Sequence, residues 1–137
     1  MTKTPFQMVS EFHAKFGVPI RTTPQTLEES EQAFRLQFLH EELDEYERAV
    51  EAGDMLKQLD ALIDLLYVAY GTLALHGFPA DEAFAVVHRA NMQKQRATSA
   101  AESAEKTGRG HALDIVKPAG WQSPEPHLQR LLDRKAR

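Results

Sequence analysis

The segment from Met55 to His76 constrains the fold more than any other, because two aspartates interrupt a sequence that is almost wholly apolar after Leu59. A helix that is apolar around most of its surface usually lies in the interior of a protein. Asp60 and Asp64 would lie about 40° apart around such a helix. A buried, unpaired carboxylate costs several kcal/mol or shifts its pKa. The two aspartates are therefore expected to face a cation.

Two kinds of cation remain open at this point. Lys57 lies three residues before Asp60 and could neutralise it in an ion pair. The other candidate is a metal ion, which needs more acidic ligands than one helix offers. The preceding segment contains the run Glu41-Glu42-Leu43-Asp44-Glu45. On a helix, residues three or four apart can converge, so Glu42 and Glu45 are candidate ligands, although such a run can also form a solvated acidic face.

An antiparallel hairpin around Gly53 would bring the acids of these two helices together. Carboxylate oxygens are hard ligands that suit Mg²⁺ or Mn²⁺ and do not suit zinc or copper. A di-iron bundle would need Glu-x-x-His pairs, and no glutamate in this chain has a histidine three residues later. The pattern favours a divalent metal bound by carboxylates in a helical bundle.

Apolar periodicity predicts an all-α fold, a bundle of about four helices with an irregular C-terminal tail. Thr26 and Glu29 form a capping-box pattern that predicts a helix start near Leu27. Leu36, Leu39, Leu43, Tyr46 and Val50 are the expected core stripe of that helix. The expected helices span Phe6–Phe16, Leu27 to about Ala52, Met55–His76 and roughly Asp81–Gln95.

The segment from Arg96 to Gly120 is rich in small and charged residues and contains several glycine and proline breakers. We expect a mobile loop or short extended excursion there, about residues 96–120, in which Leu113, Ile115 and Val116 could form a brief strand. Ser123-Pro124 predicts the start of a last short helix. A length of 137 residues favours a single domain over residues 1–137.

Composition excludes some function classes. Cysteine is absent, so disulfides and thiolate metal sites are excluded. The net charge of −4 argues against general nucleic-acid binding. The first residues lack the apolar core of a signal peptide, and the longest apolar run, Leu65–Tyr70, is short for a membrane span. We expect a soluble, cytoplasmic protein with no nucleic-acid and no membrane partner.

The acidic motifs resemble those of the all-α nucleoside triphosphate pyrophosphatases. Glu41-Glu42-x-x-Glu45, followed by two acids in an apolar run, is similar to MazG-like proteins, phosphoribosyl-ATP pyrophosphohydrolases and dimeric dUTP pyrophosphatases. The segments Asp60–Gly71, Val87–Lys94 and Lys117–Trp121 resemble the single-domain, phosphoribosyl-ATP-hydrolase-like branch. The resemblance covers most of the chain. It departs at Ala61, where the family pattern Glu-x-x-Asp has its glutamate.

The resemblance implies a metal-dependent enzyme that hydrolyses a (deoxy)nucleoside triphosphate to the nucleoside monophosphate and pyrophosphate. Mg²⁺, for which Mn²⁺ can substitute, would neutralise the triphosphate and lower the pKa of a bound water. Glu41 would orient or deprotonate that water. The metal ligands would be Glu42, Glu45, Asp60 and Asp64, and the substrate-binding residues Asn91, Lys94, Lys117 and Trp121.

Several alternatives stay open. Lys94 could be an ordinary surface lysine, and Trp121 a packing anchor. The substrate could be phosphoribosyl-ATP or dUTP, and a non-catalytic helical adaptor is the alternative of another class. In the resembled family, helices from two protomers complete the core, and the apolar surface from Leu62 to Leu75 is consistent with a homodimer or a homotetramer built from dimers.

Overall fold

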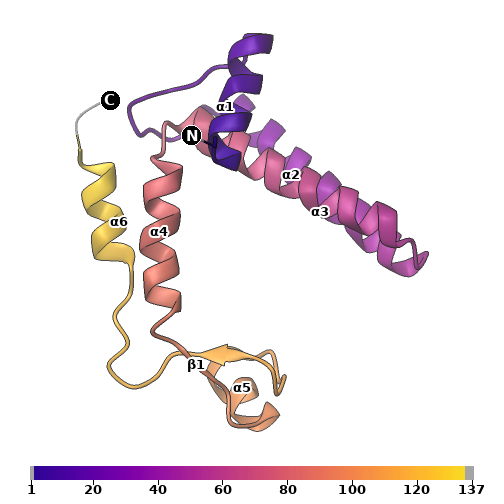
Figure 1. Ribbon diagram of the computed structural model, residues 1–137, viewed down its shortest axis with the longest axis vertical. Helices are drawn as coiled ribbons and strands as arrows, with labels where there is room; N and C mark the ends of the chain where they lie inside the picture. Colours follow the sequence, from indigo (N-terminus) through magenta and orange to yellow (C-terminus); the bar gives the residue numbers. More distant parts are fainter. Residues whose placement is uncertain (1, 135–137) are drawn as a thin grey trace. The chain divides into compact units, whose positions relative to one another are not determined.

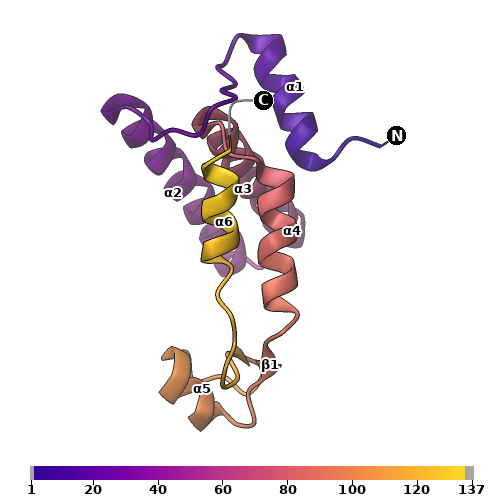
Figure 2. The ribbon, with the colours of Figure 1, turned by 90° about the vertical axis from the view of Figure 1, so that its left-hand side faces the viewer.

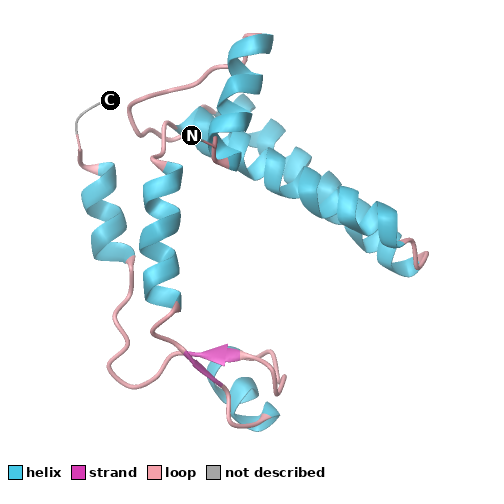
Figure 3. Cartoon of the chain, viewed as in Figure 1, coloured by secondary structure: helices cyan, strands magenta, loops and turns pink. Residues whose placement is uncertain are grey.

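A computed structural model describes residues 2–134 and confirms the all-α class (Figures 1 and 3). Across this range, six helices and one two-stranded sheet are present. The helices are α1 (Pro5–Phe16), α2 (Glu29–Glu51), α3 (Met55–His76), α4 (Ala80–Asn91), α5 (Ala100–Thr107) and α6 (Glu125–Leu132), and the strands are β1 (Gln95–Arg96) and β2 (Ile115–Val116). The described chain divides into two compact units: unit 1 over residues 2–81 with Arg134, and unit 2 over Glu82–Asp133.

In unit 1, α2 and α3 form the predicted hairpin and lie side by side (Figures 1 and 2). The turn uses Gly53 at φ 65°, a conformation that glycine adopts without strain. Asp54 is the N-cap of α3, and its side chain accepts a hydrogen bond from the Lys57 amide. This tight connection fixes the register in which the acids of the two helices face each other.

Helix α1 packs against α3 near the far end of the hairpin. There, Gly71 permits a close approach, because a Cβ at this position would lie 2.6 Å from Arg35 Nη2 and 2.9 Å from His13 Nε2. Arg35 donates hydrogen bonds to the Thr72 hydroxyl and the Val68 carbonyl, while the buried His13 ring bonds the carbonyl of Pro19. Hydrogen bonds thus join α2 to α3, and His13 of α1 to the segment that follows α1.

The predicted capping box at the start of α2 is wrong. The helix begins at Glu29, and its N-cap, Glu28, makes no side-chain cap hydrogen bond. The preceding chain is hydrogen-bonded to the end of α3, where the Gln25 amide donates to the His76 carbonyl, and Leu27 is buried. These tertiary contacts override the local pattern. A capping box is present instead at the start of α1, between Thr4 and Gln7.

The expected core stripe of α2 is largely exposed in the single chain, with Leu36 at 54%, Leu43 at 49% and Val50 at 49%. Helix α3 is also less interior than expected, because the helices that pack against it within unit 1 are α1 and α2. Its buried residues are Ala61, Val68, Gly71, Ala74 and Leu75. The exposed apolar residues of α3 are Met55, Leu56, Leu59, Leu62, Ile63, Leu66 and Tyr67. The uncovered surface therefore lies nearer the start of α3 than the predicted Leu62–Leu75.

Helix α3 is long and apolar enough to cross a membrane by length and composition alone, and no other helix within residues 2–134 passes this test. Core helices of soluble proteins commonly pass it too. Asp60 and Asp64 lie within this helix.

Unit 2 replaces the loop expected over residues 96–120 with a small folded module. Strand β1 pairs antiparallel with β2, with Gln95 opposite Val116 and Arg96 opposite Ile115. The brief strand is thus confirmed, although Leu113 lies outside it. The predicted fourth helix ends at Asn91, short of Gln95, because the following residues turn and enter this sheet.

The sequence reading missed α5. Its N-cap is Ser99, whose hydroxyl accepts from the Glu102 amide, and the Glu102 carboxylate accepts from the Thr98 amide. This Ser-x-x-Glu pattern is a recognisable helix start. Gly108 ends the helix at φ 78°.

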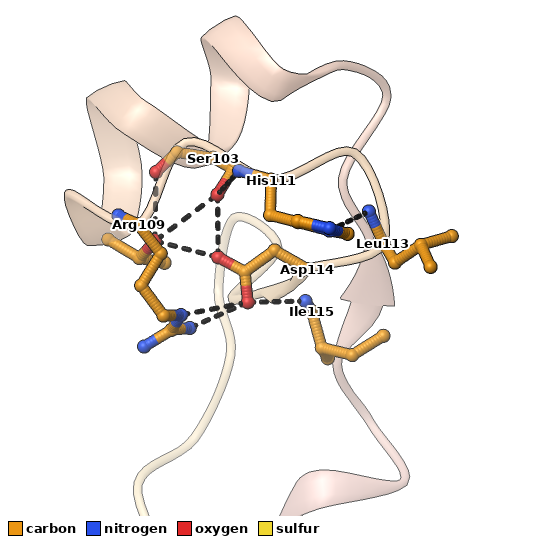
Figure 4. Close-up of polar contacts among 7 residues, drawn as sticks. Ser103, Arg109, His111, Leu113, Asp114 and Ile115 are labelled. Atoms are coloured by element: carbon orange, nitrogen blue, oxygen red, sulfur yellow. Dashed lines mark hydrogen bonds and ion pairs between the residues drawn. The ribbon is translucent and has the colours of Figure 1, made fainter. Parts of the chain in front are cut away.

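Asp114 joins α5 to β2. Its carboxylate accepts hydrogen bonds from the hydroxyls of Ser103 and Thr107, from the Ile115 amide, and from two nitrogens of Arg109 (Figure 4). These bonds, led by the one from Arg109, hold the pKa of Asp114 well below its usual range. Ser103 is fully buried. The module is therefore organised around one polar centre.

Candidate active site

Three of the four predicted metal ligands converge in unit 1. Glu42 and Glu45 lie one turn apart on α2, and Asp64 lies on the facing α3. One carboxylate oxygen from each falls within 4.8 Å of the other two. The hairpin turn at Gly53 produces this juxtaposition, as the sequence predicted.

Two of these three carboxyl groups have raised pKa values. Burial, followed by the charges of Glu45 and Asp64, raises the pKa of Glu42 above its ordinary value. Burial, followed by the charges of Asp60 and Glu45, raises the pKa of Asp64. Like charges held this close favour protonation unless a cation compensates them.

Glu42 Oε2 provides a test of whether a cation fits. This oxygen is buried and has no hydrogen-bond partner among residues 2–134. A buried acceptor without a partner is costly. A divalent cation among the three carboxylates would satisfy it, and the donor set consists of the hard oxygens that Mg²⁺ and Mn²⁺ prefer. The residues present therefore fit such an ion.

Asp60 lies at the edge of this group. It is not one of the three converging carboxylates, but its charge is close enough to raise the pKa of Asp64. With Glu45 and Lys57 it lines a cavity of about 530 Å³ between α2 and α3. Within residues 2–134 no ion pair joins Lys57 to Asp60. The alternative in which Lys57 neutralises Asp60 by direct contact is therefore wrong.

The same cavity is lined by Ala61, the position at which the resembled family has a glutamate. Asp60 and Ala61 thus border the same space. Glu41, the predicted base, is exposed, and its Oε1 accepts a hydrogen bond of 3.1 Å from Gln37 Nε2. It lies outside the three-carboxylate group.

The predicted substrate-binding residues lie in unit 2. Lys94 Nζ and Lys117 Nζ lie 5.0 Å and 4.9 Å from the centroid of the Trp121 ring. The indole Nε1 donates a 2.8 Å hydrogen bond to the Ala90 carbonyl, which supports the anchor role for this tryptophan. Asn91 is the last residue of α4 and, with Lys94, borders a second cavity of unit 2. Lys94 and Lys117 thus both lie over the ring of Trp121.

Two basic residues of unit 2 were not among the site residues predicted from the sequence. Lys106 and Arg109 line one cavity together with Lys94 and Lys117. The missed helix start at Ser99 would have placed Lys106 in the last turn of a helix and Arg109 just beyond it. In unit 1, the partly buried Arg35 was also missed, although it lies two helical turns before Glu42 on the same side of α2.

Residues 9–91 match the profile of the phosphoribosyl-ATP pyrophosphohydrolase family, which is more than half of the chain. The chain belongs to this family. Among curated proteins none matches the chain. The family match assigns a pyrophosphohydrolase, and so a hydrolase, as the class of protein.

The range that matches the family covers the predicted acids of this pyrophosphohydrolase but only one of its four predicted substrate-binding residues. It contains all five predicted acids, from Glu41 to Asp64, and extends to Asn91. It ends before Lys94, Lys117 and Trp121. Glu42, Glu45 and Asp64 therefore fall within the part of the chain that defines the family, whereas Lys94, Lys117 and Trp121 lie beyond it.

Proposed function

We propose that this protein is a divalent-metal-dependent pyrophosphohydrolase that cleaves a (deoxy)nucleoside triphosphate to the nucleoside monophosphate and pyrophosphate. The observation that carries this proposal is the convergence of carboxylate oxygens from Glu42, Glu45 and Asp64, together with the buried Glu42 Oε2, which has no hydrogen-bond partner among residues 2–134. Family membership supports the reaction type.

Glu42, Glu45 and Asp64 would hold the metal, with Asp60 as a further ligand. A bound Mg²⁺ supplies charge neutralisation for the triphosphate and a lowered pKa for attacking water. Glu41 would take a proton from that water while the oxygen of the water forms a bond to the α-phosphorus. The bond between the α-phosphorus and the oxygen that bridges it to the β-phosphorus would break, and pyrophosphate would leave with that oxygen. The hydrogen bond from Gln37 engages Oε1, so Oε2 of Glu41 is the oxygen that would take the proton.

The departing pyrophosphate carries extra negative charge and needs cations. Lys94 and Lys117 would supply them, and Asn91 would hydrogen-bond the sugar or base. Trp121 would position the two lysines through its ring, with its indole N–H held by Ala90.

We also propose that two protomers pair through the exposed apolar faces of α2 and α3. Exposed leucine and isoleucine side chains along one helix seldom stay uncovered over such a length in a soluble monomer. Leu59 at 60%, Ile63 at 52% and Leu66 at 54% exposure belong to this surface. Pairing would give a homodimer, or a homotetramer built from dimers.

The experiment that tests the proposal is pyrophosphate release from the common NTPs and dNTPs with Mg²⁺, Mn²⁺ or EDTA. Metal-dependent release with a nucleoside monophosphate as co-product supports it. The family's own description makes phosphoribosyl-ATP the second candidate substrate, and it belongs in the same panel with dUTP. If every substrate stays intact with both metals, the proposal fails and a non-catalytic helical adaptor takes its place.

A further inference from the structure

Unit 2 contains a basic cavity of about 490 Å³ between the end of α5, β2 and the residue before β1. Four basic side chains line it: Lys94, Lys106, Arg109 and Lys117. They come from three separate stretches of the chain, and the fold of the small module brings them together.

Two of these cations have no carboxylate partner. Lys94 and Lys117 make no ion pair within residues 2–134, and each ammonium instead lies over the Trp121 ring. A cation–π contact leaves the charge of the ammonium uncompensated. Both lysines can therefore still bind an anion.

The other two cations are only partly compensated. Lys106 Nζ is exposed and lies 3.6 Å from the partly buried Glu102 carboxylate one turn away on α5, and pairs at this spacing on a helix are weak. Arg109 uses Nε and Nη2 to bond Asp114, while its Nη1 has no partner in the described part of the chain. Asp114 also accepts bonds from Ser103 and Thr107, so its charge is shared among several donors.

The charge balance of the module also points to an anion. The segment Lys94–Lys117 contains five lysines and arginines and three acids, a net charge of +2 in a chain of net charge −4. A concave site with several cations at close range suits one compact ligand of high charge density, whereas nucleic acid is usually met by an extended basic stripe.

We propose that this cavity binds the polyphosphate chain of the substrate and the pyrophosphate product, with Lys106 and Arg109 as phosphate-binding residues beside Lys94 and Lys117. This inference rests on the proposed function for the identity of the anion. The α5 module is then a phosphate-binding addition beyond the range that matches the family.

Trp121 provides a direct readout, because it is the single tryptophan of the chain and two of the four cations lie over its ring. Inorganic pyrophosphate is titrated into the intact protein in EDTA, so that no divalent metal links the ligand to the carboxylates. We expect a saturable change in tryptophan fluorescence. Lys106→Ala leaves the ring contacts intact and should weaken binding about tenfold, the value of one charge-assisted hydrogen bond.

The matched control is Lys3→Ala, because Lys3, like Lys106, is an exposed lysine that pairs with a single carboxylate, here that of Glu11. It should change pyrophosphate affinity by less than about twofold. No saturable response in the wild type, equal weakening in both variants, or tighter binding of an oligonucleotide without terminal phosphates would overturn the inference.

The experiments distinguish failure of the phosphate-binding cavity from failure of the proposed function. Pyrophosphate binding that depends on Lys106, in a protein that hydrolyses none of the substrates, supports the cavity and rejects the enzyme. Metal-dependent hydrolysis in a protein that does not bind pyrophosphate in EDTA rejects the cavity and leaves the enzyme in place.

Discussion

Glu42 on α2 and Asp64 on α3 bring carboxylate oxygens within 4.8 Å of each other, and the pKa of each is raised by burial and by neighbouring acids. Two carboxylates in this arrangement destabilise the metal-free protein and create the site that a divalent cation would fill. The relationship sets the first two predictions.

Asp64→Asn should lower kcat/KM by at least about 10²-fold, because it would weaken binding of the metal ion, and the ion supplies several kcal/mol of charge stabilisation in the transition state. Its thermal stability in EDTA should equal or exceed that of the wild type, since one of the repelling charges is gone. Asp44→Asn, at an exposed position on the other side of α2 from Glu42, is the matched control and should keep wild-type turnover. Full activity in Asp64→Asn would remove this residue from the site.

The pKa shifts predict an unusual dependence of stability on pH. Because the folded state raises the pKa of Glu42 and Asp64, it binds protons more tightly than the unfolded chain does. The contribution of these two carboxyl groups to the free energy of unfolding in EDTA should therefore rise as the pH falls from neutral through the raised pKa values, and fall as the pH increases. Denaturant titrations of the wild type and of Glu42→Gln measure the difference, and Glu42→Gln should show the weaker rise on acidification.

Saturating Mg²⁺ should reverse that trend, because protons compete with the metal for the same oxygens. Stability in Mg²⁺ is then expected to decline on acidification. If the two curves, with Mg²⁺ and with EDTA, coincide at every pH, the carboxylates do not bind the ion.

Asp60 should contribute less to metal binding than Asp64 does, because it lies outside the converging group. Asp60→Asn is expected to weaken Mg²⁺ affinity about tenfold, the size of effect typical of supporting groups around a metal. Isothermal titration of both variants with Mn²⁺ or Mg²⁺ gives the comparison. A larger loss in Asp60→Asn than in Asp64→Asn would make Asp60 a direct and dominant ligand.

Gly71→Ala should destabilise the protein by about 1–3 kcal/mol, the usual cost of overpacking. The added Cβ would lie 2.6 Å from Arg35 Nη2 and 2.9 Å from His13 Nε2, so one of the two side chains must move. Gly53→Ala is the reference for backbone strain alone, because Gly53 has a positive φ and open space around it. Equal thermal stability of Gly71→Ala and the wild type would contradict the packing observed.

Ile63→Lys should shift the protein from a dimer to a monomer, since it places a charge on the exposed apolar face of α3. Glu47→Lys adds a lysine at an exposed polar position of α2 and should leave the oligomeric state unchanged. Light scattering after size-exclusion chromatography measures the mass of each. A monomeric wild-type protein would contradict the proposed pairing.

Much of unit 1 follows from local sequence. Apolar periodicity predicted α1 and α3 almost to the residue, and Gly53 with Asp54 predicted the turn between α2 and α3. These signals are local, because helix spacing, a left-handed glycine and a capping aspartate act over a few residues. The convergence of Glu42, Glu45 and Asp64 then follows from helical spacing and a tight hairpin.

Only the tertiary structure decided the remaining features. The start of α2 depends on hydrogen bonds from the chain before it to the end of α3, which lies far away in sequence. The basic cavity depends on Asp114 tying α5 to β2, a contact among residues that read separately as a loop. Periodicity describes which side of a helix is apolar, but it does not state what covers that side. The sequence by itself therefore determined α1, α3 and the convergence of the three acids, whereas the start of α2, the burial of side chains and the grouping of the cations required long-range contacts.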